Sequence, residues 1–445
     1  MQAVNHKIFK SYDIRGVYPR ELNEETAYLI GRTFARRAQA KEIIVGTDMR
    51  LSGPELKKAL IEGLTDEGAN VIDIGLVPID AVYAAVGIFG HEAGLMITAS
   101  HNPPEYNGFK MVLKNMVWIR GEELYHEVIN LPPLEKNTKG QLRSLDIIPK
   151  YIDHVMSFVD PKRIKPFKVV VDAGNGMAGK IIPFLEKRLP IKIIPLNFTL
   201  DGHFPAHPSN PLMPESQKQI CAAVVGEKAD FGVIFDGDTD RLFFVDEKGN
   251  FVPADITLLL LAKIFLEREP GAGIVYNLIC SKIVPEKIKE WEGRALRTKT
   301  GYVNISQKMR EEKGIMGGEL SAHYSFRDNA YADSGFIAFL ILLELLSENE
   351  KPLSVIISPF YKYIKSPEFN LEVEDSGKII EKIKEEYKEG RQDELDGITV
   401  EYDDFWFNVR PSNTEPLLRI TVEGNTPEIL NKERDKLIKY IKKNL

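Results

Sequence analysis

The sequence contains few cysteines, and this excludes two kinds of cysteine-based structure. Its 445 residues include only Cys221 and Cys280. Two cysteines so far apart cannot build a disulfide framework or a cysteine-based metal knuckle. They are compatible with a reducing compartment, and we expect their thiols to be buried.

Long hydrophobic runs are also missing. The longest, around Ile256–Leu266 and Phe336–Leu346, hold about 11 residues each, whereas a membrane span needs about 20. Residues Met1–Lys10 lack the apolar core of a signal peptide. We therefore expect two buried helices, no membrane partner and a cytoplasmic location.

A basic excess is absent as well. The formal net charge is -7, and the lysines and arginines are spread along the chain. Proteins that bind nucleic acid usually show a clustered basic face, so no nucleic-acid partner is expected. An anionic small molecule is still compatible with this composition, because a few local arginines suffice to bind it.

Three segments share one pattern: a short β-branched run, a turn and a helical stretch. The runs are Glu42–Gly46, Lys168–Val171 and Gly273–Tyr276. Continuous apolar strands joined by helical crossovers indicate mostly parallel sheets. The spacing between the runs is too long for a solenoid, so the pattern predicts three related α/β domains.

Shifts in composition suggest where the domains end. Leu131–Asp146 is rich in proline and polar residues and is a candidate linker. The residue composition changes again after Ser366–Pro367. The predicted domains are 1–148, 149–251, 252–365 and 366–445, the last a smaller α+β domain. Within it, the strongly charged Glu381–Asp396 is predicted to be a solvated helix.

The first chemistry-bearing segment contains Ser100. The apolar run Gly94–Thr98 ends in small and polar residues and a proline, which predicts an exposed loop carrying Ser100 and His101. Asn107-Gly108 predicts a tight turn that returns Lys110 to the same region. A serine becomes a nucleophile only with help from a base, a metal or a charged leaving group. A helix-capping serine explains this segment equally well.

The second segment is an aspartate triplet between two predicted apolar strands, Phe231–Phe235 and Leu242–Val245. In an extended chain Asp236, Asp238 and Asp240 would face the same way and repel one another unless a cation lay between them. A hard divalent ion fits these oxygen ligands, and Mg²⁺ is the usual partner of phosphate chemistry. Arg241 could balance charge on a nearby phosphoryl group.

Three other interpretations of the triplet stay open at this point. In an EF-hand loop Glu247 would be the twelfth residue, but Arg241 stands where a glycine is needed. An aspartyl-phosphate site of the haloacid dehalogenase type would use Asp236 as nucleophile, but Asp240 stands where threonine or valine is usual. The third is a solvated acidic turn.

The third segment is a glycine-rich loop. Gly317-Gly318 would let the backbone turn and approach a ligand closely. Glu319 and Ser321 alternate towards one side and offer an acceptor and a donor for adjacent sugar hydroxyls, with His323 two residues further on. A purely structural loop is the alternative.

The fourth segment joins two predicted strands, Phe405–Val409 and Leu417–Val422. Between them two prolines fix the backbone, and donors lie on a compact arc: Arg410, Ser412, Asn413 and Thr414. Backbone amides in such a turn form an anion nest, and arginine adds a charged clamp, so a phosphate group is the expected guest. A hairpin with a solvated arginine is the alternative.

Together these segments resemble the α-D-phosphohexomutase superfamily, and they follow that family's order along the chain. The resemblance spans nearly all of the sequence and rests on Phe9–Gly16, Thr98–Pro103, Asn107–Lys110, Asp236–Arg241, Gly317–His323 and Arg410–Pro416. Within the superfamily the chain looks most like the phosphomannomutase/phosphoglucomutase branch.

The resemblance implies three related α/β domains with mixed, largely parallel sheets and a smaller α+β domain around a central cleft. It implies a phosphoserine at Ser100, whose phosphate is a further ligand of a Mg²⁺ ion bound by the three aspartates. A hexose 1,6-bisphosphate would be the intermediate and activator. The substrates would be hexose phosphates, and the protein is expected to be a monomer or weak homodimer.

The same resemblance implies roles for single residues. His101, Lys110, Arg15 and Arg241 would manage proton transfer and charge at the phosphoryl group. The sugar loop would hold two hydroxyls through Glu319 and Ser321, supported by His323. The phosphate distant from Ser100 would be bound by Tyr12, Arg410, Ser412, Asn413 and Thr414.

Two positions depart from that branch and leave the preferred hexose open. Tyr302 stands where histidine is usual, and Ile279 stands where a basic phosphate ligand is usual, so that Lys282 or Lys299 would have to replace it. Phosphomannomutase, with phosphoglucomutase as a further activity, is the leading hypothesis. The alternatives are phosphoglucosamine mutase, a metal-dependent sugar-phosphate phosphatase and a catalytically silent sensor.

Overall fold

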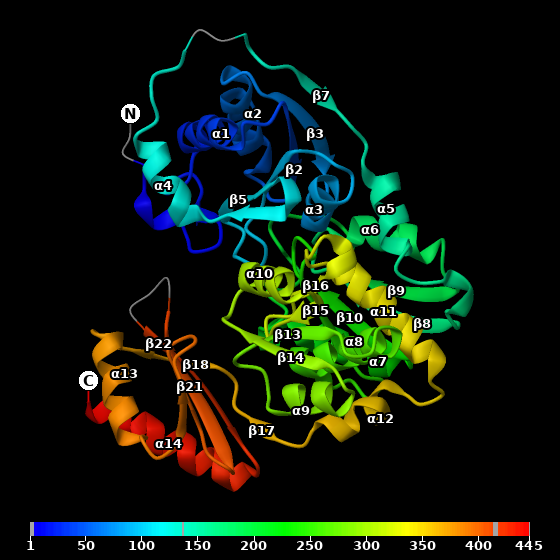
Figure 1. Cartoon of the computed structure of the whole chain (residues 1–445). Coiled ribbons are helices and arrows are strands. Elements are labelled where there is room, and N and C mark those ends of the chain that lie inside the picture. The colour runs from blue at the N-terminus through cyan, green and yellow to red at the C-terminus, as the bar shows by residue number, and fades with distance from the viewer. Residues whose placement is uncertain (1–3, 136–137, 413–416, 445) are drawn as a thin grey trace.

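The computed structural model describes residues 4–135, 138–412 and 417–444, which form four sheet-based domains. The first lies at the top of Figure 1, the second and third pack together below it, and the fourth lies at the lower left. Each of the first three sheets combines parallel central strands with antiparallel strands towards one edge. This confirms the predicted mixed α/β architecture.

The first domain is built on a seven-stranded sheet with the order β1-β5-β4-β2-β3-β7, where β6 pairs with β5. The strands are β1 (Ile14–Val17), β2 (Glu42–Thr47), β3 (Asn70–Leu76), β4 (Ala93–Ile97), β5 (Tyr106–Leu113), β6 (Val117–Ile119) and β7 (Leu142–Ser144). The helices are η1 (His6–Ile8), α1 (Glu24–Ala38), α2 (Gly53–Asp66), α3 (Ile79–Gly87), η2 (Lys114–Met116) and α4 (Gly121–Ile129).

The turn predicted at Asn107-Gly108 is wrong. Both residues lie inside β5 and pair with Gly16 and Arg15 of β1. A Cβ at position 108 would come within 2.0 Å of the Ile14 carbonyl oxygen. The glycine therefore permits close strand pairing, and strand β5 carries Lys110 to the site.

The second domain has the strand order β12-β11-β10-β8-β9. Its elements are α5 (Ile148–Met156), η3 (Pro161–Arg163), β8 (Phe167–Asp172), α6 (Ala178–Glu186), β9 (Ile191–Leu196), α7 (Pro214–Glu227), β10 (Phe231–Phe235), β11 (Leu242–Val245) and β12 (Phe251–Val252). The aspartate triplet occupies the loop between β10 and β11.

The third domain has the strand order β14-β13-β15-β16. Its elements are α8 (Ala254–Arg268), β13 (Gly273–Asn277), α9 (Ile283–Glu290), β14 (Arg294–Thr298), α10 (Tyr302–Glu312), β15 (Gly314–Gly318), β16 (Tyr324–Phe326), η4 (Arg327–Asn329), α11 (Gly335–Glu348), α12 (Leu353–Ile357) and η5 (Ser358–Phe360).

The fourth domain is an antiparallel sheet with the order β17-β22-β21-β20-β19, where β18 pairs with β22. Its elements are β17 (Ile364–Lys365), β18 (Phe369–Glu372), α13 (Ser376–Glu386), β19 (Arg391–Asp393), β20 (Ile398–Glu401), β21 (Phe405–Pro411), β22 (Leu417–Gly424) and α14 (Pro427–Lys443). The helix predicted over Glu381–Asp396 is thus partly wrong. α13 ends at Glu386, and β19 pairs its polar residues with β20 at the sheet edge.

The two longest apolar runs form α8 and α11, as predicted. Almost every residue of both helices is buried, because they pack in a core that the second and third domains share. Much of the first domain and all of the fourth have cores of their own. Among the described residues, none of the helices has the length and apolar character needed to cross a membrane.

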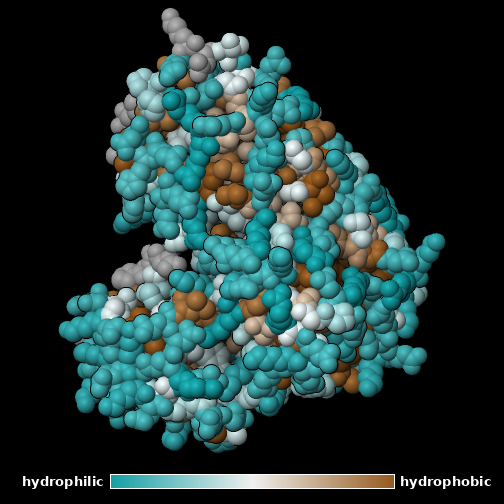
Figure 2. All heavy atoms as spheres, in the orientation of Figure 1, coloured by the Kyte–Doolittle hydropathy of each residue, from teal (hydrophilic) through white to brown (hydrophobic). Residues whose placement is uncertain are grey.

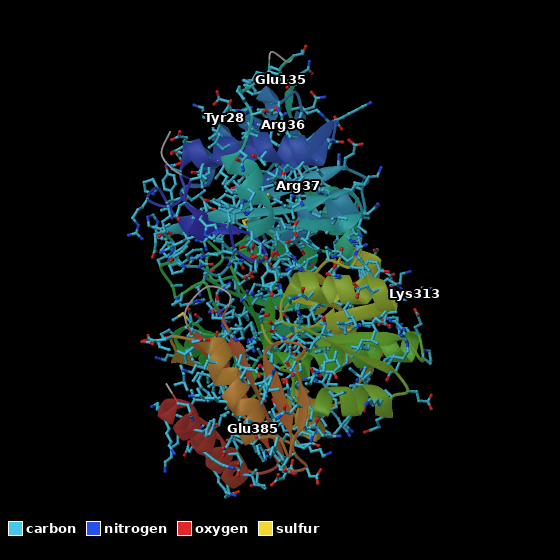
Figure 3. The ribbon with its side chains drawn as sticks, turned by 60° about the vertical axis from the view of Figure 1, so that its left-hand side comes forward. Tyr28, Arg36, Arg37, Glu135, Lys313 and Glu385 are labelled. Atoms are coloured by element: carbon cyan, nitrogen blue, oxygen red, sulfur yellow. The ribbon has the colours of Figure 1, made fainter. Side chains whose placement is uncertain are left out.

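Polar contacts fix α1 on the outside of the first domain (Figure 3). Tyr28 donates a hydrogen bond to Asp66 at the end of α2, and Arg36 pairs with Glu67 just beyond it. Arg37 pairs with two glutamates of α4. Helices α1, α2 and α4 therefore form one layer over the sheet.

A deep notch separates the first domain from the fourth (Figure 2). The atoms on both sides of it are mainly hydrophilic. The Pro411 end of β21 and the Leu417 end of β22 lie on the side of the fourth domain that faces the notch (Figure 1). Such a cleft suits a small polar ligand that must be enclosed from several sides.

Candidate active site

Ser100 lies in the loop between β4 and β5, directly against the aspartate loop. Its hydroxyl donates a hydrogen bond to Asp236 Oδ2 at 2.7 Å, and its amide donates to Thr98 Oγ1 at 2.9 Å. The residue has a φ of 50°, a left-handed conformation that is uncommon for serine. The predicted exposure is wrong: Ser100 is fully buried, because loops of the second domain cover it.

Asp236, Asp238 and Asp240 converge as the sequence predicts, although not through an extended chain. Their loop turns, with Thr239 at a φ of 74°, and one oxygen from each carboxylate lies within 4.8 Å of the others. All three side chains are buried. Burial and the two neighbouring carboxylates raise the pKa of Asp236 to about 8.

The triplet passes a simple test of fit for a divalent cation. Asp238 Oδ1 and Asp240 Oδ1 are buried and accept no hydrogen bond from any described residue. Buried carboxylate oxygens without donors are costly unless a cation satisfies them. Together with Asp236, they form an all-oxygen ligand set of the kind that Mg²⁺ prefers.

Lys110 is the cation nearest to these carboxylates. Its Nζ lies 2.9 Å from Asp238 Oδ2 and 2.5 Å from Asp240 Oδ2, and its side chain is buried. Burial opposes the charge, but the two carboxylates hold the pKa of Lys110 well above its usual value. The residue is therefore a fixed positive charge in the site.

Arg15 and His101 complete the surroundings of the serine loop. Arg15 pairs with Asp13 and donates to Asn102 Oδ1 at 2.7 Å. His101 Nδ1 lies 3.4 Å from Ser100 Oγ. Burial and the nearby cations lower the pKa of His101 well below its usual value, so its imidazole is neutral.

Arg241 links the aspartate loop to the glycine-rich loop. Its Nε donates to His323 Nε2 at 3.0 Å, and His323 Nδ1 donates to Asp333 Oδ2 at 2.6 Å. Because Arg241 can only donate, this chain requires a neutral His323 with its proton on Nδ1. A β-bridge between Arg241 and His323 joins the second domain to the third at this point.

Glu319 and Ser321 lie close together, as expected for a pair that serves one ligand. Ser321 donates to Glu319 Oε1, and the amide of Gly301 donates to Glu319 Oε2. The role expected of the paired glycines is wrong. Gly317 and Gly318 end strand β15, where Cβ atoms would collide with Ile305 and Tyr324, so these glycines make room for the core.

Tyr302 stands at the first turn of α10 and forms part of an aromatic cluster. Its ring stacks on His323 with centroids 5.3 Å apart, meets Trp118 edge-on and lies 6.0 Å from Tyr12. Tyr12 in turn donates to the Thr300 carbonyl at 2.8 Å. Through this cluster the first domain contacts the third. The cluster lies beside Lys110, whose Nζ is 5.8 Å from the Tyr302 ring centroid.

Ile279 supplies a backbone group where a basic side chain was expected. Its carbonyl accepts a hydrogen bond from Lys365 at 3.0 Å, and Lys365 pairs with Asp255. Lys282, a predicted replacement, pairs with Glu401 of the fourth domain at 3.0 Å. Lys282 therefore serves a contact between the third and fourth domains, and Lys365 fixes the segment that joins them.

Arg410 lies at the end of β21 on the notch side of the fourth domain. It is buried and pairs with Glu368 at 2.6 Å. The amide of Ser412 donates to the Leu417 carbonyl at 2.9 Å, which joins the described ends of the two strand segments. Asn413 and Thr414 lie outside the described residues.

The structure also identifies residues that the sequence reasoning missed. Arg50 and Ser209 both contact the Ser100 carbonyl, and Asp48 supports Arg50. The signal for the first was present: Asp48 and Arg50 directly follow β2, at the carboxyl ends of parallel strands where ligands usually bind. Ser209 stands in a loop and carries no comparable signal.

The EF-hand alternative is wrong. The Glu247 carboxylate accepts hydrogen bonds from the amide and hydroxyl of Ser354, far along the chain, and Leu242–Val245 is a strand.

Comparisons with known proteins assign the chain to a class. Its four parts match the phosphoglucomutase/phosphomannomutase alpha/beta/alpha domains I, II and III over 6–126, 149–249 and 253–363, and the C-terminal domain over 368–439. These ranges together cover most of the chain. The protein therefore belongs to the phosphoglucomutase/phosphomannomutase family, within the α-D-phosphohexomutase superfamily.

Individual relatives agree with this assignment. The chain is 40% identical to a phosphomannomutase of Vibrio cholerae, with 98% of each chain covered. It is 40% identical to a phosphomannomutase/phosphoglucomutase of Pseudomonas aeruginosa, covering 96% of this chain and 93% of that protein. A solved family protein of Burkholderia thailandensis superposes with a TM-score of 0.91 at 33% identity, covering 99% and 98%.

Proposed function

We propose that the protein is a phosphomannomutase that interconverts mannose 6-phosphate and mannose 1-phosphate, with the glucose pair as a further substrate. The observation that carries this proposal is the placement of Ser100 Oγ 2.7 Å from Asp236, within a cluster of three carboxylates and several cations. A phosphoserine would carry about −1.5 to −2 charges and needs such surroundings. The full-length similarity to named phosphomannomutases supports the same substrate.

The reaction would begin with phosphorylated Ser100. A free hydroxyl of the bound sugar phosphate attacks the phosphorus, the bond between phosphorus and Ser100 Oγ breaks, and the bisphosphorylated sugar forms. In this proposal His101 accepts the hydroxyl proton and passes it to the departing Ser100 Oγ, which lies 3.4 Å from its Nδ1, while Lys110, Arg15 and Arg241 balance charge on the phosphoryl oxygens. Phosphoryl transfer depends mainly on such positioning and electrostatics.

The sugar then turns over and returns its other phosphate to Ser100. This step requires a second phosphate site and a sugar site that accepts both orientations. Arg410 and Ser412, with Asn413, Thr414 and Tyr12, are proposed for the second phosphate. Glu319 and Ser321 are proposed for the sugar hydroxyls, with His323 and Tyr302 lining the same space.

Mg²⁺ is the metal we propose for Asp236, Asp238 and Asp240, with the phosphate on Ser100 as a further ligand. Bound there, it would neutralise charge on the phosphoryl group. A hexose 1,6-bisphosphate is the proposed activator. We further propose a cytoplasmic monomer or weak homodimer, and the domain limits 1–148, 149–251, 252–365 and 366–445, within which the matched ranges lie.

Coupled assays with Mg²⁺ and a trace of hexose 1,6-bisphosphate test the proposal. Mannose 1-phosphate, glucose 1-phosphate and glucosamine 1-phosphate are supplied separately, and 6-phosphate formation and free phosphate are measured. We expect conversion of the mannose ester with little free phosphate. Activity on glucosamine 1-phosphate alone, or release of phosphate without isomerisation, would contradict it.

A further inference from the structure

The backbone around Ser100 has little support of its own. Residues 99–105 form neither helix nor strand, and Pro103 and Pro104 have no amide hydrogen to donate. Two turn hydrogen bonds lie within the loop, from Asn102 to Ala99 and from Tyr106 to Pro103. Buried carbonyl groups in such a loop need donors from elsewhere.

One side chain donates to several of these carbonyls. Arg50 Nη2 donates to the carbonyls of Ser100 at 2.8 Å and Asn102 at 2.6 Å. Its Nη1 donates to the carbonyls of Pro103 at 2.7 Å and Tyr106 at 2.8 Å. A single guanidinium therefore binds four carbonyls of the nucleophile loop.

Arg50 is itself held in a fixed position. Its side chain is completely buried, its Nε lies 3.5 Å from Asp48 Oδ2, and its amide donates to Asp48 Oδ1 at 3.0 Å. The Phe204 ring, from the second domain, lies 5.1 Å below the guanidinium carbon. Gly202 of the same loop leaves no room for a Cβ, which would come within 2.7 Å of the Met49 carbonyl oxygen.

The Ser100 carbonyl receives a second donor from this neighbouring loop. Ser209 Oγ lies 3.4 Å from it, on the side of the second domain. The nucleophile loop is thus fixed by Arg50 from the first domain and by residues 202–209 from the second. The Ser100 backbone, at a φ of 50°, is held in a conformation in which its hydroxyl donates to Asp236.

We propose that Arg50 is a positioning residue for phosphoryl transfer, which fixes the Ser100 loop through its carbonyls without touching the sugar. The proposal rests on the function proposed above. Arginine suits this role because its planar fork presents five donors in a fixed geometry, whereas lysine has three donors around one nitrogen and cannot reach four carbonyls together.

The expected consequence is a selective loss of transfer rate. Because misplacement by about 1 Å can cost on the order of 100-fold, Arg50→Lys should slow phosphoryl transfer between Ser100 and a hexose 1,6-bisphosphate by about 10- to 100-fold. The KM for mannose 1-phosphate should stay within about 3-fold, since ground-state binding involves other residues. A looser loop should also lose more phosphate to water.

The experiment compares Arg50→Lys with Arg32→Lys. Arg32 is also buried in the first domain, and it bonds Glu67 and the Pro132 carbonyl away from the site. Transfer is followed in single-turnover experiments by intact mass, KM and kcat are measured separately, and free phosphate is counted per turnover. Thermal unfolding gives the folded fraction of each variant.

We expect Arg50→Lys to lower kcat and raise phosphate release per turnover, while Arg32→Lys changes neither. Phe204→Leu, which keeps every hydrogen bond of Arg50, should also raise phosphate release per turnover, but by less. Equal behaviour of the two lysine variants would overturn the proposal. So would a fall in kcat that the unfolded fraction explains, with phosphate release per turnover unchanged. A wild-type protein that never becomes phosphorylated would instead overturn the proposed function.

Discussion

At the scale of single residues, the site is organised by the placement of its cations. Asp236 and Asp240 stand in the same loop, yet their pKa values shift in opposite directions. Burial and two carboxylates raise the pKa of Asp236 to about 8. Asp240 is equally buried, but the Lys110 ammonium, 2.5 Å away, and the Arg241 guanidinium lower its pKa below the usual range. Of these two aspartates, Asp236, which faces Ser100, therefore has the less compensated charge, and a bound cation would compensate it.

Asp236→Asn should separate activity from stability. At neutral pH the metal-free carboxyl is largely protonated, so the amide replaces it with little change in charge, and the melting temperature without metal should stay equal or rise. Activity should fall by about 100- to 1,000-fold, as when other preorganised electrostatic groups are removed. The stabilisation that Mg²⁺ binding gives to the wild type should be absent in Asp236→Asn.

Thermal unfolding with and without Mg²⁺, beside the coupled assay, measures these effects. Asp230→Asn, in an exposed turn of the same domain, is the control. Full activity in Asp236→Asn would contradict the metal site, as would full activity of the wild type after removal of divalent ions by EDTA.

His207 gives the structure a stability that depends on pH. Its Nδ1 faces the Pro208 carbonyl at 2.8 Å and its Nε2 faces Asp172 Oδ2 at 3.1 Å, so both nitrogens require a proton. Burial opposes that charge, but the hydrogen bond and charge of Asp172 raise the pKa of His207 above its ordinary value. The stabilisation is complete below about pH 6.5, the usual histidine pKa. It is lost as pH rises through the higher pKa of the folded state.

The melting temperature of the wild type should therefore exceed that of His207→Asn most clearly at pH 5.5 to 6, and the difference should shrink towards pH 8.5. Unfolding curves across this range measure it, with exposed His203→Asn as the control. A difference that stays constant with pH, or grows as pH rises, would show that the imidazolium has no such role.

The chemical roles of the site residues were easier to predict from the sequence than their burial and contacts. Ser100, the aspartates and Arg241 could be selected because their chemistry is specific to phosphate and metal. Their burial could not, because the loops that cover Ser100 come from residues 202–209, about 100 positions further along the chain. Arg50 was missed for a related reason: its place after β2 indicated a ligand site, but its partners are backbone carbonyls of a loop about 50 residues further along the chain.

At the scale of elements, close packing of α1 on α2 is set by two glycines. A Cβ at Gly63 would lie 2.1 Å from the Tyr28 carbonyl oxygen, and one at Gly31 would lie 2.4 Å from that of Leu60. The helix backbones therefore touch at these points. The hydrogen bond from Tyr28 to Asp66 lies along the same contact.

Gly63→Ala should destabilise the protein by about 1–3 kcal/mol, the usual cost of overpacking a close contact. Gly226→Ala is the matched control, since it lies in helix α7 with open space around its α-carbon and should stabilise by about 0.5–1 kcal/mol. Denaturant unfolding of the two variants measures both. If the two substitutions changed the free energy of unfolding equally, the close approach of α1 and α2 would not contribute to stability.

Elements built from apolar runs were predicted well, and those decided by pairing partners were not. Strands β10 and β11 begin and end as predicted, because a buried strand must be continuously apolar. Asn107-Gly108 has turn chemistry but pairs with β1, nearly 100 residues earlier. The charged segment after Glu386 becomes an edge strand because β20 is available beside it.

At the scale of the whole molecule, each domain contributes one part of the proposed site. The first provides Ser100 and Lys110, the second the aspartates and the third the sugar loop. The fourth adds Arg410 across the notch. The order of these parts along the chain made the family predictable, and the comparisons confirm that family. The convergence of the parts depends on contacts between domains, which no single segment encodes.

Arg410→Gln tests whether the fourth domain binds the phosphate that is distant from Ser100. If Arg410 binds the phosphate distant from Ser100, it contributes equally to ground and transition states, so KM should rise about 10- to 100-fold while kcat changes little. Arg434→Gln, on α14 and paired with the neighbouring Asp435, is the control. A fall in kcat with an unchanged KM would place Arg410 in a different role.

The central claim concerns a phosphate carried by Ser100, and intact mass spectrometry measures it most directly. Wild-type protein and Ser100→Ala are incubated with Mg²⁺ and a hexose 1,6-bisphosphate, freed of small molecules and weighed. The account predicts one added phosphoryl group on the wild type and none on the variant. An unmodified wild type, or a variant that gains the same mass, would contradict it.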